Sequence, residues 1–151
     1  MEIKGLLFKA ADKIMAFLNT HRKPRIYVLN SQFNYVPYNV IYITLDIVFR
    51  NECTVSRNLY DISVILRNKK DRTVYTEELQ DILHYGETQC TTIKLSPKDE
   101  YRPKMQCAFS LDKGLLNATE LLIGYKLFRG KINQTKVYKF SNYLGSEVQF
   151  L

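Results

Sequence analysis

Between residues 41 and 49 the chain reads IYITLDIVF, with an apolar side chain at every second position. A period of two is typical of a β-strand that buries one face and leaves the other at least partly wet. The side chains of Ile43, Leu45 and Ile47 are therefore predicted to point into a core.

Similar alternating runs lie on both sides of this strand. Residues 25–35 are predicted to form a strand with an irregularity, because the apolar parity shifts between Val28 and Phe33. Residues 77–83 are ambiguous, since their apolar residues have helical spacing and favour a short helical turn. Further strands are predicted within 60–66, 73–76, 91–95, 105–111, 121–127 and 136–140, and residues 148–151 either add a short edge strand or fray. About eight short strands with regular turns predict an all-β sandwich or barrel.

The first 21 residues follow a helical period instead. Apolar side chains recur at steps of three and four residues, which is the spacing of one face of an amphipathic helix. They are Ile3, Leu7, Ala10, Ile14, Phe17 and Leu18. Pro24 ends this segment, because proline disfavours the helical conformation of the residue before it. The chain is thus predicted to consist of an amphipathic helix over residues 1–23 and a β-sandwich domain over residues 24–151.

The positive charge of the chain is concentrated in this N-terminal segment. The formal net charge is +7, and residues 1–25 contain six cationic and two acidic side chains, a surplus of four. A basic segment suits anionic lipid or nucleic acid, and it also keeps proteins soluble. The candidate interaction residues are the cations and large apolar residues of the helix and its end. They are Lys4, Leu7, Lys9, Lys13, Ile14, Phe17 and Arg22.

The helix has three interpretations that its sequence leaves open. Its apolar stripe can fold back on the sandwich and cover an edge or an open end. It can lie in a membrane interface with its cations at the headgroups. It can also pair with a second copy or with a helix of a partner.

No catalytic, cofactor or metal site is predicted. The chain has three cysteines, Cys53, Cys90 and Cys107, and no CxxC pair, which indicates reduced and mostly buried thiols. The two histidines, His21 and His84, do not stand in a recognisable nucleophile–base pattern. No secretory signal and no apolar run long enough to span a membrane is found, so a cytoplasmic location is expected, with peripheral membrane contact left open.

Several short segments after residue 40 stand in an order known from one family. They are FRN at 49–51, LYDISV at 59–64, GET at 86–88 and LSPKD at 95–99, the last leading to Phe109. With these segments, residues 40–128 resemble the small bacterial immunoglobulin-like modules, including the FxLYD-like group. The chain departs from that group at Arg57, which replaces its phenylalanine, and at Lys98, which replaces its glycine. The resemblance implies an immunoglobulin-like antiparallel β-sandwich of about seven or eight strands and a role in contacts, not chemistry.

We therefore expect a non-enzymatic protein-interaction module that is positioned by its N-terminal helix. Its partner is expected to be a protein, and loops or an exposed edge strand of the sandwich offer the binding surface. Two alternatives stay open. One is an electrostatic nucleic-acid-binding protein, and the other is peripheral association with an anionic membrane through the helix. A homo-oligomer is compatible with all three.

Overall fold

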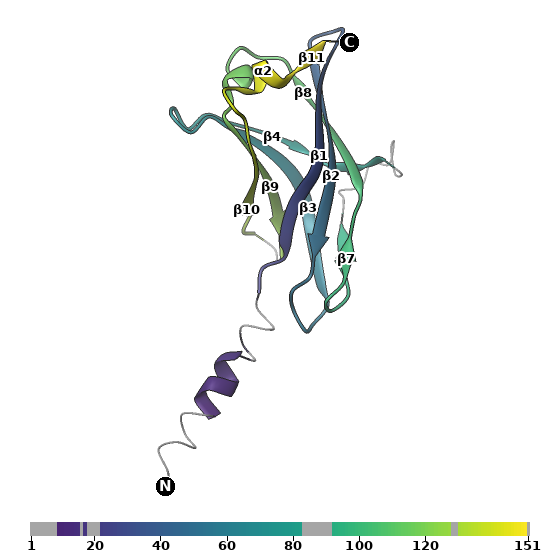
Figure 1. Ribbon diagram of the computed structural model, residues 1–151, viewed down its shortest axis with the longest axis vertical. Coiled ribbons are helices and arrows are strands. Elements are labelled where there is room, and N and C mark those ends of the chain that lie inside the picture. The colour runs from purple at the N-terminus through teal and green to yellow at the C-terminus, as the bar shows by residue number, and fades with distance from the viewer. Residues whose placement is uncertain (1–8, 16, 18–21, 83–91, 128–129, 151) are drawn as a thin grey trace.

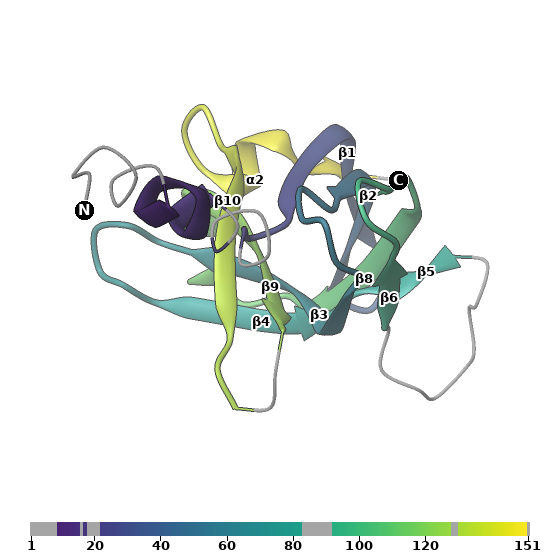
Figure 2. The ribbon, with the colours of Figure 1, turned by 90° about the horizontal axis from the view of Figure 1, so that it is seen from below.

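The chain folds into two β-sheets that face each other across a common core (Figures 1 and 2). The computed structural model describes residues 9–15, 17, 22–82, 92–127 and 130–150. The all-β class predicted from the sequence is confirmed in these residues.

The first sheet has six strands in the described part of the chain. They are β1 (Arg25–Val36), β2 (Val40–Arg50), β5 (Gln80–Asp81), β7 (Glu100–Tyr101), β8 (Lys104–Ser110) and β11 (Gln149–Phe150). Their order is β11-β1-β2-β8-β5, and the short β7 pairs with β2. All these pairings are antiparallel except that of β1 with β11.

The second sheet has five strands within the same ranges. They are β3 (Arg57–Arg67), β4 (Val74–Glu78), β6 (Ile93–Leu95), β9 (Glu120–Lys126) and β10 (Asn133–Lys139). Their order is β10-β9-β3-β4, with β6 pairing with β3. Two short helical segments, η2 (Leu115–Asn117) and α2 (Leu144–Glu147), were not indicated by the sequence pattern.

The central strand β2 supplies the middle of the core. Ile43 and Leu45 are fully buried and Ile47 is 1% exposed, as the alternation of residues 41–49 predicted. The irregularity expected in the preceding strand is also confirmed, because the pairing of β1 with β2 shifts between Val28 and Asn30. Such a bulge lets both ends of β1 direct their apolar side chains inward although the parity changes between them.

One side of the fold is closed by aromatic side chains. The ring of Phe33 on β1 lies 5.3 Å from that of Phe140 and 5.9 Å from that of Tyr138 on β10. Tilted and edge-to-face pairs of this kind are favourable beyond the apolar area that they bury. They fill the gap between β1 and β10, so the core is sealed on a side where no backbone hydrogen bond joins these two strands in the described part of the chain.

The other side is joined by the backbone itself. β4 belongs to the second sheet and β5 to the first, and only Leu79 lies between them. Its side chain is fully buried, and its N–H donates to the carbonyl of Ile62 over 2.9 Å. Strands that switch sheets make the corners of packed sheets.

A hydrogen bond holds β5 at the end of this crossing. The Tyr101 hydroxyl donates to Oδ2 of the buried Asp81 over 2.6 Å. Burial and this hydrogen bond to a carboxylate raise the pKa of Tyr101 to about 12. The phenol therefore stays protonated at neutral pH and remains a donor to Asp81.

Over residues 77–81 the chain forms strands on either side of Leu79, and not the short helical turn that the ambiguous pattern of residues 77–83 favoured. Residues 77–78 and 80–81 are strand, and Ile82 has 3-10 conformation, while Leu83 lies outside the described residues. The apolar spacing has another cause. Leu79 points into the core at the crossing, where β3 on one side and β8 on the other provide backbone partners.

The N-terminal segment leads away from the two sheets (Figure 1). Residues 9–15 and 17 have helical backbone, and the side chains of Ile14, Met15 and Phe17 are between 56% and 60% exposed. The carbonyl of Arg22 accepts a hydrogen bond from the buried Cys53 thiol, with Sγ and O 2.9 Å apart. This bond ties the start of β1 to the loop that follows β2.

Truncating Leu45 tests the assignment of the core. We expect Leu45→Ala to lower the free energy of unfolding by about 2–5 kcal/mol, because a fully buried leucine is replaced by a cavity. Thr54→Ala, at an exposed position in the loop after β2, should change it by less than about 0.5 kcal/mol. Urea denaturation of both variants measures the difference, and a Leu45→Ala cost as small as that of the control would contradict the assignment.

A groove between two strand edges

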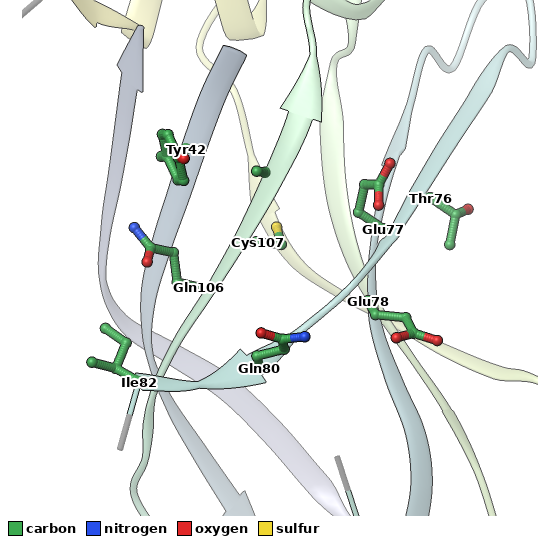
Figure 3. A pocket seen from close by; sticks show the side chains of 9 residues that line it. Tyr42, Thr76, Glu77, Glu78, Gln80, Ile82, Gln106 and Cys107 are labelled. Atoms are coloured by element: carbon green, nitrogen blue, oxygen red, sulfur yellow. The ribbon is translucent and has the colours of Figure 1, made fainter. Parts of the chain in front are cut away.

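A groove opens where β4 and β8 diverge from the crossing at Leu79. It consists of two adjoining hollows of about 600 and 490 Å³, which share Thr76 and Glu77. Figure 3 shows the residues that line the larger of these two hollows. The first is lined by Tyr42, Thr76, Glu77, Glu78, Gln80, Ile82, Gln106, Cys107 and Ala108. The second is lined by Tyr75, Thr76, Glu77, Phe109, Ser110, Leu111 and Asp112. The groove thus runs along β8, with β4 as its opposite wall.

The hydrogen-bonding pattern of β8 shows which backbone groups face this groove. Hydrogen bonds join Leu111 N to Asn39 O over 2.8 Å and Ile47 N to Pro103 O over 3.1 Å. The register between these two bonds is unbroken. In an antiparallel ladder, hydrogen-bonded and non-bonded pairs alternate. The odd-numbered residues of β8 therefore bond to β2.

It follows that the even-numbered residues of β8 direct their N–H and C=O groups toward the other edge. At Gln106 that edge is occupied, because β5 pairs there with β8. Within the described residues, β5 reaches only Met105 and Gln106 of β8. The backbone groups of Ala108 and Ser110 therefore form an open strand edge along the groove.

The opposite wall has the same organisation. Hydrogen bonds from Leu79 N to Ile62 O and from Asn68 N to Thr73 O fix the phase of the β3–β4 ladder. Counting in steps of two from these bonds, Tyr75 opposite Leu66 and Glu77 opposite Val64 are the hydrogen-bonded pairs of the ladder. Their backbone groups consequently bond to β3, whereas the backbone groups of Thr76 and Glu78 point toward the groove.

The side chains of Tyr75 and Glu77 lie on the inner face of β4. Paired residues of neighbouring strands project to the same face, and their partners Leu66 and Val64 belong to the core. Tyr75 packs against the edge of this core, and its hydroxyl donates to Oδ2 of Asp112 over 3.5 Å. Glu77 is exposed at the mouth of the groove.

The groove contains a thiol that is kept neutral. Burial raises the pKa of Cys107, and the negative charge of Glu77 raises it further. A reactive cysteine needs the opposite, a lowered pKa next to positive charge. Cys107 therefore acts in this wall as a small apolar side chain.

A second, basic hollow lies on the other sheet. It has a volume of about 390 Å³ and is lined by Ile65, Arg67, Lys69, Arg72, Val74 and Gln134. Arg67 is paired with the buried Glu120, whose Oε1 lies 2.7 Å from Nε and 2.6 Å from Nη2. Lys136 approaches the other oxygen of Glu120 to 3.7 Å. None of the residues that line this hollow is aromatic.

Of the residues predicted to interact from the sequence, those that the structure describes do not line the groove. Lys9, Lys13, Ile14 and Phe17 are exposed on the helical segment, and Arg22 is exposed just before β1. Lys4 and Leu7 lie outside the described residues, as do His84 and Cys90. The groove itself was missed, because β4 and β8 are about thirty residues apart in the sequence and no local pattern links them.

Two further structural findings bear on function. In the part of the chain that the structure describes, no group of three or more His, Cys, Asp or Glu side chains is placed to bind a metal ion. Within the same residues, every helix is too short or too polar to cross a membrane.

Comparison with known proteins adds little. No protein-family model matches the chain, and no curated protein matches it. Among solved structures it is similar to DesR, a β-glucosidase from Streptomyces venezuelae in complex with D-glucose, with 9% sequence identity and a TM-score of 0.29. The match covers 76% of this chain and 15% of that chain, so this chain spans a small part of the length of DesR. A likeness at this level carries no argument about fold or activity.

Amide hydrogen exchange tests the open edge of β8. The amides of Cys107 and Phe109 are expected to exchange slowly, because they donate to β2 in the middle of the sheet. Those of Ala108 and Ser110 should exchange faster, because no hydrogen bond to a neighbouring strand has to open first. NMR of the amide signals compares the two sets, and equally slow exchange at all four positions would contradict the open edge.

Proposed function

We propose that this protein is a non-enzymatic protein-interaction module that binds an extended peptide by adding it as a strand to β8. The observation that carries the proposal is the open strand edge at Ala108 and Ser110. This edge faces a groove that β4 closes on its other side. In strand addition, main-chain hydrogen bonds provide affinity and pockets for alternate side chains provide specificity. The groove offers both, since the hollows on either side of Ala108 accept side chains.

The architecture expected from the family resemblance is part of this proposal. An immunoglobulin-like arrangement is supported by two sheets over one core, and by seven strands of five or more residues among those described. The four shorter strands, β5, β6, β7 and β11, lie at the margins of these sheets. In such folds, function is carried by sites on the scaffold, and the scaffold alone does not define the partner.

A peptide suits the groove better than nucleic acid does. Glu77, Glu78 and Asp112 line the groove, and carboxylates repel a phosphate backbone. The basic hollow near Lys69 and Arg72 lacks the aromatic lining on which single-stranded bases stack. Arg67 in that hollow is already paired with Glu120.

Proline at position 108 tests strand addition. Ala108→Pro removes an N–H that β2 does not use, and proline is tolerated where the N–H of an edge strand faces away from the sheet. We expect the variant to fold and to lose binding to an array of ten-residue peptides by about tenfold or more, through one lost hydrogen bond and the clash of its ring with the added strand.

Ala108→Val is the matched control, because it adds similar volume and keeps the N–H. It should bind the array like the unmodified protein. The melting temperatures of both variants establish that the fold persists. Equal binding by Ala108→Pro and Ala108→Val would contradict strand addition to β8.

A second candidate function rests on the N-terminal segment. We infer from its exposed apolar side chains that the helix positions the module by lying on an anionic membrane. The side chains of Ile14 and Met15 are more than half exposed. Lys9 and Lys13 are also exposed, and their spacing of four residues places them on the same side of the helix. This combination is typical of helices in a membrane interface.

Charge reversal on the helix tests this second function. Each cation close to an anionic surface contributes about 1 kcal/mol to binding, so Lys9→Glu combined with Lys13→Glu should strongly reduce sedimentation with vesicles that contain phosphatidylserine. Lys69→Glu combined with Lys70→Glu makes the same change of charge in an exposed turn of the β-domain and should leave sedimentation unchanged. If the unmodified protein fails to sediment with these vesicles at low salt, this function is excluded.

A further inference from the structure

We propose that the segment bound on β8 is basic, and that it directs a lysine or arginine side chain inward between β8 and β4, onto Glu77. The inference rests on the proposed strand addition and specifies its ligand. The identity of the ligand follows from the direction in which every second side chain of an added strand points.

The pleat of β8 fixes the direction of these side chains. Cys107 and Phe109 are 6% and 3% exposed and belong to the core, so the odd-numbered residues of β8 point inward. A residue of the added strand directly opposite one of them projects to the same face. Every second side chain of the ligand therefore enters the space between the two sheets, and the others stay outside beside Ala108 and Ser110.

The surroundings of this inner position combine apolar walls with negative charge. Phe109 and Cys107 form one wall, and Tyr75 on the inner face of β4 forms part of the other. Glu77 lies at the mouth of the groove, next to Cys107 (Figure 3). Asp112, which accepts the Tyr75 hydroxyl, closes the far end of the groove.

Lysine and arginine match this combination. Both have a long apolar stem that packs along rings and a charged head that stays near water. The stem would contact Phe109 and Tyr75 while the head reaches Glu77, which forms no ion pair within the described residues. A purely apolar side chain would remove water from Glu77 without replacing its charge partner, and an acidic side chain would be repelled.

The local charge supports the same ligand. The chain as a whole has a net charge of +7, yet Glu77, Glu78 and Asp112 all line the groove. Burial is the main cause of the raised pKa of Cys107, and the negative charge of Glu77 raises it further. The groove is therefore an acidic strip on a basic protein, and its carboxylates attract cationic segments.

Three labelled peptides separate charge selectivity from strand addition itself. Each has ten residues with threonine at every second position, and the intervening residues are all lysine, all glutamine or all glutamate. Fluorescence anisotropy with the full chain should show that the lysine peptide binds tightest, and that salt weakens this peptide most.

Glu77→Gln should weaken binding of the lysine peptide about fivefold and leave the glutamine peptide unchanged, a ratio typical of one exposed ion pair. Glu52→Gln removes the same charge outside the groove and should change neither peptide. Ala108→Pro should weaken the lysine and glutamine peptides alike, because it acts on the backbone.

The possible failures are distinguishable. The three peptides could bind equally well, and Ala108→Pro could abolish this binding. That result would overturn the basic ligand and leave strand addition standing. The same holds if Glu77→Gln and Glu52→Gln behave alike. Binding of none of the peptides would overturn both. Concentration-dependent dimers that Ala108→Pro disrupts would assign the edge to a second copy of this chain and overturn the basic-peptide inference.

Discussion

The passage of the backbone through Leu79 is the constraint on which the rest of the arrangement depends. One buried residue separates a strand of the second sheet from a strand of the first, so the two sheets are covalently joined at this corner. The hydrogen bond from Leu79 to Ile62 holds one side of the corner, and the bond from Tyr101 to Asp81 holds the other. Since a single residue cannot span two separated sheets, β4 and β8 must lie close together here and diverge beyond it.

This divergence explains why the two lateral sides of the fold differ. On the side of β1 and β10, the chain crosses from β10 to β11 through the longer segment 140–148, and rings of Phe33, Tyr138 and Phe140 fill the space. On the side of β4 and β8, the crossing covers only the first part of β8 and leaves an edge at Ala108 and Ser110. Open edges are a liability because they pair with other chains, and proteins usually cover or charge them. In the proposed function, the flanking carboxylates would discourage uncontrolled pairing and would favour basic segments.

The two proposed functions use different parts of the molecule and are compatible. The helix of residues 9–15 and 17 leads away from the sheets (Figure 1). The groove, in contrast, is lined by residues of β4 and β8. Their charges are opposite, with Lys9 and Lys13 on the helix and Glu77 and Asp112 in the groove. A protein that rests on an anionic surface through the helix would therefore keep the acidic groove free, because the surface repels the groove.

The sequence alone was sufficient for two features that depend on neighbouring residues, whereas its pattern did not indicate the short helical segments η2 and α2. The period of two predicted the inward direction of Ile43, Leu45 and Ile47, and the change of parity predicted the bulge after Val28, because strand pleating is a local property. Local pattern failed at residues 77–83, where pairing with β3 and β8 overrides helical spacing. It also could not reveal the groove. The open edge at Ala108 arises because β5 stops at Gln106, and Glu77 reaches Cys107 only through the packing of two sheets. Such proximity between distant residues follows from tertiary contacts, so it cannot be predicted from the spacing of residues along the chain.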